Sequence, residues 1–179
     1  PLLREVASTR IPVILSSGMS GLDEVERAVE VVSRHHENIT ILHCISQYPS
    51  QYENIGLPRI TELKQRFPSY AIGYSDHSVG IVVPVAAVCL GAQVIEKHIT
   101  LSRQLKGSDH AGALEADGLW RMVRDIRNVE RALRPVADQS RRRAAHPSQA
   151  KLRRSLAVRR PMKRGELLRE DDLSMLSPG

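Results

Sequence analysis

Four short aliphatic runs recur along the chain, and a segment with helical periodicity follows each of them. The runs lie at residues 11–15, 39–45, 71–73 and 93–95, and the helical segments at residues 22–34, 57–67, 81–90 and 116–133. Strands that alternate with helices in this way are typical of a parallel sheet whose connections are helical crossovers. The alternation therefore predicts an α/β fold with four βα units.

The regularity of these units favours a (β/α)8 TIM barrel over an open sheet, because no glycine-rich dinucleotide fingerprint follows any of the strands. A complete barrel of this type needs about 250 residues. The four units fit within residues 1–133, so we expect this domain to be the carboxyl-terminal half of a barrel. On this interpretation the chain is a fragment without the amino-terminal half.

The composition changes after residue 133. Residues 134–150 are mainly Arg, Ala, Gln, Ser and Pro without apolar periodicity, and they are expected to form a linker. Residues 151–179 are typical of the start of a second small domain. They contain a predicted strand at 155–158, a basic turn that ends at Gly165, and an apolar segment at 167–173.

Composition limits the environment of the protein. Hydrophobic residues make up 41% of the chain and aromatic residues 3%, which suits an aliphatic core between helices and a buried parallel sheet. The longest apolar run, residues 81–95, is too short to span a bilayer, and no signal peptide is visible. We expect a cytoplasmic protein without a membrane partner, in which Cys44 and Cys89 are buried free thiols.

Polar side chains follow the predicted strands at their carboxyl ends. These residues are Ser16, Ser17, Ser46, Tyr48, Ser75, His77, Glu96 and His98. In a parallel α/β fold all carboxyl ends lie on one face, and that face holds the functional site. We therefore expect the four groups to converge, whereas His43, inside a predicted strand, is expected to be a core histidine.

Several chemical roles fit these residues. His77 and His98 could share a metal ion, with Asp76 and Glu96 as ligands or supporting partners, or they could be ordinary hydrogen-bonded histidines. The serines could bind a phosphate or carboxylate, or they could cap helices. The loop at residues 101–113, which contains Asp109, is either a substrate cover or a solvated loop.

Six segments together resemble the sialic acid synthase family, which comprises N-acetylneuraminate synthase and related nonulosonic acid synthases. The segments are SSGM (16–19), HCISQYP (43–49), GYSDHSVG (73–80), EKHITL (96–101), KGSDHAGALE (106–115) and the stretch at 155–173. The resemblance implies a TIM barrel, a linker and a small antifreeze-like (SAF) domain. It also implies a domain-swapped homodimer, in which each SAF domain covers the barrel of the partner.

The resemblance further implies that phosphoenolpyruvate condenses with the aldehyde of an N-acylated hexosamine such as N-acetylmannosamine. Carbon 3 of phosphoenolpyruvate attacks the aldehyde, water adds at carbon 2, and phosphate leaves. A divalent ion, Mn2+ or Mg2+, polarises the aldehyde oxygen. His77 and His98 match the metal ligands, and Glu96 matches a carboxylate that accepts a proton from water.

The remaining site residues match substrate contacts of the family. Ser17, Ser46 and Ser75 correspond to positions that contact phosphoenolpyruvate, although some bacterial relatives have asparagine in place of Ser46. Tyr48 and Asp109 correspond to positions that hold hydroxyls of the amino sugar. The lysines and glutamates of the first half-barrel and the SAF arginine have no counterpart here, so we expect no turnover by these 179 residues alone.

Three other interpretations remain open. Another phosphoenolpyruvate-condensing aldolase would share the barrel, but the segment at 155–173 argues against it. A nucleic-acid or anionic-surface binder would use the arginines of residues 121–170, but no aromatic residues are interspersed with those on the helix for base stacking. A half-barrel without catalysis is the third possibility.

Overall fold

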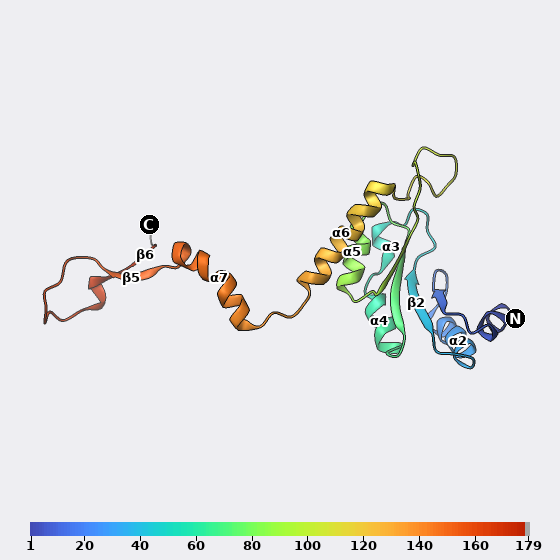
Figure 1. The fold of residues 1–179 in the computed structure, drawn as a ribbon, viewed down its shortest axis with the longest axis horizontal. Coiled ribbons are helices and arrows are strands. Elements are labelled where there is room, and N and C mark those ends of the chain that lie inside the picture. Colours follow the sequence, from blue (N-terminus) through green and yellow to red (C-terminus); the bar gives the residue numbers. More distant parts are fainter. Residues whose placement is uncertain (178–179) are drawn as a thin grey trace. The chain divides into compact units, whose positions relative to one another are not determined.

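The computed structural model describes residues 1–177, and the chain divides into two compact units, Pro1–Leu133 and a second that begins at Arg134. The first unit contains four parallel strands in the order β1-β2-β3-β4 (Figure 1). Their bounds are β1 Val13–Ser16, β2 Ile39–Cys44, β3 Ala71–Asp76 and β4 Val94–Lys97. This consecutive order is the arrangement of half a (β/α)8 barrel, and it confirms the predicted parallel sheet.

Strands β3 and β4 continue further than their aliphatic runs. Ser75 pairs in register with Glu96, and Asp76 pairs with Lys97, so these polar residues belong to the ladder. The aliphatic runs end before the strands do, because the last two residues of each strand are polar. Polar side chains are accommodated here because they bond to one another across the two strands.

Six helices accompany the sheet in the first unit: α1 Leu2–Ser8, α2 Leu22–Ser33, α3 Tyr52–Ile55, α4 Arg59–Arg66, α5 Val82–Cys89 and α6 Ala116–Ala132. The helix expected at residues 57–67 is α4, and the short α3 precedes it. Gly56, which has a φ of 61°, ends α3 in the left-handed conformation that glycine adopts readily. Pro58 then occupies the N-cap position of α4.

Side-chain alternation along the strands forms the core. Ile41 and its register neighbour Ile72 lie on the face of the sheet that packs against the helices. They are buried in one cluster with Val29 and Val32 of α2 and Ile60 of α4. On β1, Ile14 has the opposite orientation and its side chain is 60% exposed. The core therefore lies between the sheet and α1, α2 and α4.

Helices α5 and α6 lie side by side, as Figure 1 shows, and Met122 and Ile126 of α6 form a second cluster with residues of α5. Helix α5 is rich in apolar residues but is only partly buried, because Val82 is 76% exposed. The expectation of a buried Cys89 is wrong, since this thiol is exposed, whereas Cys44 is buried. Helix α5 packs on β3 and on α6, while its residues Val82 and Cys89 are exposed.

The segment that is expected to be a linker contains a helix. Helix α7, Asp138–Leu152, covers most of residues 134–150. Alanine, arginine and glutamine have high helix propensity, so a helix forms here although the sequence has no apolar periodicity. Strands β5 Ser155–Val158 and β6 Leu173–Leu176 form an antiparallel pair, with the 3-10 helix η1 at Glu170–Asp172 before β6. The strand expected at 155–158 is confirmed.

Arg160 holds the turn of this pair together, because its guanidinium contacts the carboxylates of Glu166 and Asp172.

Across residues 1–177, no helix combines the length and the apolar character that a membrane span requires.

The alternation on the strands generates a test with matched substitutions. Ile41→Ala removes a side chain that is fully buried, and we expect it to lower the free energy of unfolding by about 2–5 kcal/mol through lost burial and cavity formation. Ile14→Ala removes the same atoms at a position that is 60% exposed, and we expect a loss under about 1 kcal/mol. Urea unfolding followed by circular dichroism and Trp120 fluorescence measures both. Equal losses would contradict the assignment of the two faces.

His43 generates a test of pH dependence. Burial lowers its pKa below the ordinary value of 6.5, and its Nε2 contacts the Ile55 carbonyl oxygen at 2.6 Å. The unfolded chain therefore binds more protons than the folded chain below about pH 6.5, and stability from neutral His43 is lost as pH falls through that value. We expect the stability advantage of wild type over His43→Gln to shrink between about pH 8 and pH 5.5, by at most about 1.4 kcal/mol per unit. An advantage that stays constant in urea unfolding across this range would contradict it.

Candidate functional site

The ends of β3 and β4 present polar side chains on the face of the sheet opposite the helices. Ser75 and Glu96 are register partners on this face, and the Ser75 hydroxyl donates a hydrogen bond to Glu96 Oε1 at 2.5 Å. His77 lies two residues after Ser75, and His98 lies two residues after Glu96. Because side chains alternate along a strand, both histidines lie on the same face as Ser75 and Glu96. The structure thus brings these four predicted residues to one edge of the sheet.

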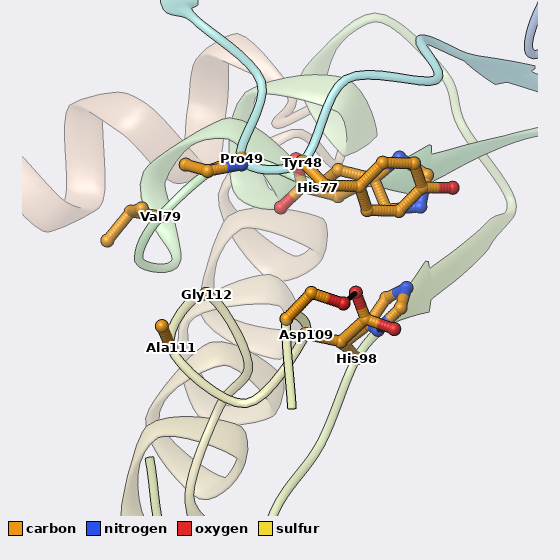
Figure 2. Close-up of a pocket in the computed structure, with 10 residues that line it drawn as sticks. Tyr48, Pro49, His77, Val79, His98, Asp109, Ala111 and Gly112 are labelled. Atoms are coloured by element: carbon orange, nitrogen blue, oxygen red, sulfur yellow. Dashed lines mark hydrogen bonds and ion pairs between the residues drawn. The ribbon is translucent and has the colours of Figure 1, made fainter. Parts of the chain in front are cut away.

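A cavity of about 270 Å³ opens at this edge. It is lined by Tyr48, Pro49, Asp76, His77, Val79, His98, Ser108, Asp109, Ala111 and Gly112. Figure 2 shows Tyr48 and His77 together on one side and His98 with Asp109 on the other. The ring centroids of His77 and His98 are 5.2 Å apart, and Tyr48 lies 4.1 Å from His77 and 5.9 Å from His98. Four of the predicted site residues therefore surround one cavity.

His77 is held in a defined orientation. Its Nδ1 lies 3.0 Å from the Ile45 carbonyl oxygen, which can only accept a hydrogen bond, so Nδ1 carries the proton in the neutral ring. The lone pair is then on Nε2. Metal-binding histidines commonly have this arrangement, because the bond at one nitrogen fixes the tautomer for the other.

The neighbouring histidine has an acidic partner. His98 Nδ1 lies 3.8 Å from Asp109 Oδ2, at ion-pair distance. Two imidazoles with centroids 5.2 Å apart are compatible with a shared divalent ion, since imidazole nitrogens bind such ions at roughly 2.0–2.1 Å. Within residues 1–177, no group of three or more His, Cys, Asp or Glu side chains is arranged to hold a metal. The metal therefore stays a prediction, with two protein nitrogens and the remaining positions for water or substrate.

Tyr48 keeps its proton at neutral pH. Partial burial raises the pKa of its phenol, and the nearby Cys44, Asp109 and Glu96 raise it further. The hydroxyl is therefore available as a hydrogen-bond donor to a ligand in the cavity. Its ring lies beside that of His77, tilted by 47°, on one side of the cavity.

Part of the loop at residues 101–113 forms the opposite wall. Thr100 Oγ1 lies 2.8 Å from His110 Nδ1, and the Arg103 backbone N–H donates to Glu115 Oε1 at 2.9 Å. The Arg103 side chain also donates to the Ala111 carbonyl oxygen. These bonds hold the loop so that Asp109 reaches the cavity. The loop is therefore a wall of the site and not only a solvated connection.

Four predicted residues lie outside the cavity lining: Ser75 and Glu96, which bond to each other, and Ser17 and Ser46. The Ser17 hydroxyl donates to the Leu42 carbonyl oxygen at 2.9 Å. Ser46 is exposed and lies against Gly18, where any side chain would collide with the Ser46 hydroxyl. These serines are neighbours at the ends of β1 and β2, and their roles as phosphoenolpyruvate contacts stay predictions.

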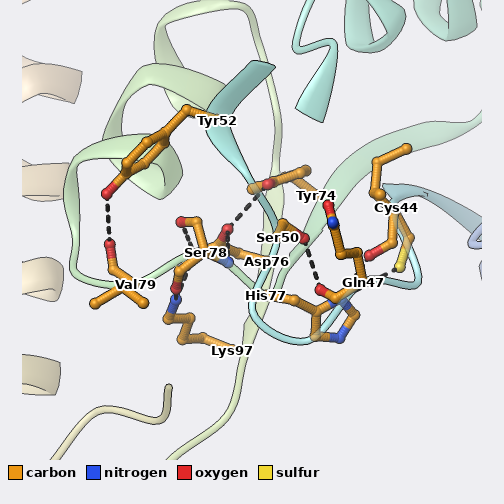
Figure 3. A network of polar contacts seen from close by, with 11 residues as sticks. Cys44, Gln47, Ser50, Tyr52, Tyr74, Asp76, His77, Ser78, Val79 and Lys97 are labelled. Atoms are coloured by element: carbon orange, nitrogen blue, oxygen red, sulfur yellow. Dashed lines mark hydrogen bonds and ion pairs between the residues drawn. The ribbon is translucent and has the colours of Figure 1, made fainter. Parts of the chain in front are cut away.

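Asp76 has a different place from the one considered for it in the sequence. Its carboxylate is fully buried and accepts hydrogen bonds from Tyr74 Oη at 2.9 Å and from the Ser78 backbone N–H at 3.0 Å. Lys97 Nζ lies 2.6 Å from Asp76 Oδ2 (Figure 3). All these donors compete with a metal, so the ligand role for Asp76 is not supported. Sequence reasoning missed Lys97, whose only signal was its position between Glu96 and His98.

The chain is similar to proteins of a known family. Residues 1–137 match the model of the NeuB family. The chain is 36% identical over 189 residues to N,N'-diacetyllegionaminic acid synthase of Legionella pneumophila, covering 100% of this chain and 51% of that protein. It is 44% identical over 133 residues to human N-acetylneuraminate-9-phosphate synthase, covering 74% and 37%.

A solved structure is also similar. The crystal structure of N-acetylneuraminic acid synthetase from Leptospira borgpetersenii in complex with citrate aligns with a TM-score of 0.73 and 34% identity, over 86% of this chain and 54% of that chain. The chain spans about half the length, or less, of the curated relatives it matches. Because the family model covers most of its residues, the chain belongs to the NeuB family.

Proposed function

We propose that these residues serve a synthase that condenses phosphoenolpyruvate with an N-acylated hexosamine, N-acetylmannosamine or an analogue, to give a nonulosonic acid and phosphate. The observation that carries the proposal is the placement of His77 and His98 across one cavity with Tyr48 and Asp109, in a chain of the NeuB family. Relatives are named as synthases of diacetyllegionaminic acid and N-acetylneuraminate 9-phosphate, which supports this reaction class.

His77 and His98 would hold a divalent ion, Mn2+ or Mg2+, through one imidazole nitrogen each. When bound, the ion supplies Lewis-acid polarisation of the aldehyde oxygen. The bond from His77 Nδ1 to the Ile45 carbonyl prepares its Nε2 for this role. Tyr48 and Asp109 would hold hydroxyls of the amino sugar, as donor and acceptor respectively.

Glu96 is proposed as the proton acceptor. A bond forms between carbon 3 of phosphoenolpyruvate and the aldehyde carbon, water adds at carbon 2, and the bond from carbon 2 to the phosphate oxygen breaks. The added water loses two protons as its oxygen becomes the ketone oxygen at carbon 2. Glu96 would accept the first, which balances the proton taken up by the aldehyde oxygen, and the second leaves with the phosphate. The Ser75 hydroxyl already donates to Glu96 Oε1, which orients the carboxylate toward the cavity face of the sheet.

Ser17, Ser46 and Ser75 are proposed to contact phosphoenolpyruvate. Ser17 would exchange its bond to the Leu42 carbonyl for one to the substrate, while Ser46 is exposed. The SAF domain, the domain-swapped homodimer and the cytoplasmic location stay predictions that rest on the resemblance and composition of the sequence.

Metal binding tests the proposal first. Isothermal titration with Mn2+ should show binding to the chain, and His77→Ala or His98→Ala should weaken it about tenfold or more, because each removes one of two nitrogen ligands. His35→Ala, at an exposed position between α2 and β2, is the control and should bind as wild type does. Equal Mn2+ affinity in all four proteins would refute the assigned ligands.

Sugar binding tests the opposite wall. Asp109→Asn removes a charge-assisted hydrogen bond, and we expect about tenfold weaker binding of N-acetylmannosamine, measured by saturation-transfer NMR titration. Asp117→Asn makes the same change at an exposed site on α6 and should leave the affinity unchanged. A sugar affinity that is insensitive to Asp109→Asn would remove this residue from the proposed site.

A further inference from the structure

An ion pair lies buried behind the candidate site, on the side of the sheet that faces the helices. Lys97 Nζ is 2.6 Å from Asp76 Oδ2, and the two side chains are 3% and 0% exposed. Asp76 and Lys97 are register partners at the ends of β3 and β4. Removing two charges from water costs several kcal/mol per ion, so a buried pair gives little net stability compared with apolar residues. We therefore expect the pair to have a role in holding neighbouring backbone in place.

Asp76 organises the turn that follows β3. Its Oδ1 accepts from the Ser78 backbone N–H at 3.0 Å, and its Oδ2 accepts from the Ser78 hydroxyl at 3.1 Å. Lys97 extends this network, since its ammonium also donates to the Ser78 carbonyl oxygen. Residue 78 is therefore held at its N–H, its hydroxyl and its carbonyl by one buried pair.

Three successive carbonyls of this turn accept hydrogen bonds from donors on two segments (Figure 3). The Ser50 N–H donates to the His77 carbonyl at 2.9 Å, and Tyr52 Oη donates to the Val79 carbonyl at 3.1 Å. Both of these donors come from the chain just after β2. Lys97, which bonds the middle carbonyl, comes from β4 and directly precedes His98. Among these three donors, it alone ties the turn of His77 to the strand of His98.

We propose that Lys97 is a positioning residue that fixes the separation of the His77 and His98 rings through the Ser78 carbonyl and Asp76. The inference rests on the proposed function, in which the two rings share a divalent ion. Without the ammonium, the carbonyls of the turn keep bonds only to the segment after β2. Ser78 stays bonded to Asp76, but no side chain of β4 then holds the turn, which can shift relative to His98. The two imidazoles then lose their common geometry, although neither ligand has changed.

Lys97→Met, in the full 179-residue chain, tests this directly. Titration with Co2+, followed by its visible absorption bands, reports both affinity and coordination. We expect an affinity about 10–100-fold weaker than wild type, as for other residues that orient metal ligands, and altered bands. Lys64→Met makes the same change at an exposed position on α4 and should bind Co2+ as wild type does.

A destabilised control separates positioning from folding. Val32→Ala removes buried core contacts on α2 and lowers stability without contacting the turn, so its Co2+ affinity should match wild type. If Lys97→Met does not fold by circular dichroism, the double variant Asp76→Asn/Lys97→Met leaves no unpaired buried ion. We expect the Co2+ affinity of this double variant to be weakened in the same way, because the bond from residue 97 of β4 to the Ser78 carbonyl is still absent.

The metal-free protein gives a second readout. Long-range 1H–15N spectra report the tautomers and environments of His77 and His98, and we expect both sets of signals to change in Lys97→Met but not in Lys64→Met. If wild type binds no Co2+, the metal site of the proposed function fails, while these spectra still test the positioning. Unchanged imidazole signals in the folded Lys97 variant, or Co2+ affinity within about twofold of wild type, would overturn the inference.

Discussion

The parallel register between β3 and β4 determines which chemical groups reach the cavity. Ser75 opposite Glu96 and Asp76 opposite Lys97 alternate between the two faces of the sheet. Because side chains alternate with a period of two, a slip of one residue would exchange the faces of one strand. It would place Lys97 on the cavity face and bury Glu96 against the helices. The site therefore depends on a pairing that the apolar core selects.

The core and the site are separate layers of the same strands. Ile41 and Ile72 in the middle of β2 and β3 are buried against the helices, and their burial fixes the register. The last two residues of β3 and of β4 are polar, and their side chains bond to one another across the two strands. At Gly73 the neighbouring strands lie so close that a side chain would collide with Leu42 and with the backbone of Val94. Tight packing in the middle thus aligns the polar ends.

Local patterns in the sequence were sufficient for the order of strands and for the convergence of His77 with His98, because in a parallel sheet all strand ends lie at one edge. The Asp76–Lys97 pair was not predictable, since it depends on a register between residues 21 positions apart in the chain. Helix α7 was missed for another reason: it forms from intrinsic propensity in residues without an apolar stripe. The exposure of Cys89 was missed because the apolar composition of α5 does not indicate which side of the helix is exposed.

The histidines of the sheet show how position decides chemistry. His43 lies on the helix-facing side of β2, where its Nε2 bonds to the Ile55 carbonyl and burial holds its pKa low. His77 lies two residues after Ser75 and therefore on the cavity side. Its Nδ1 bonds to a backbone carbonyl, which leaves Nε2 for a ligand. Both rings are fixed by one carbonyl bond, so rigidity does not distinguish them. The difference is the face of the sheet, because only on the cavity side does the second nitrogen meet space, a second imidazole and a carboxylate.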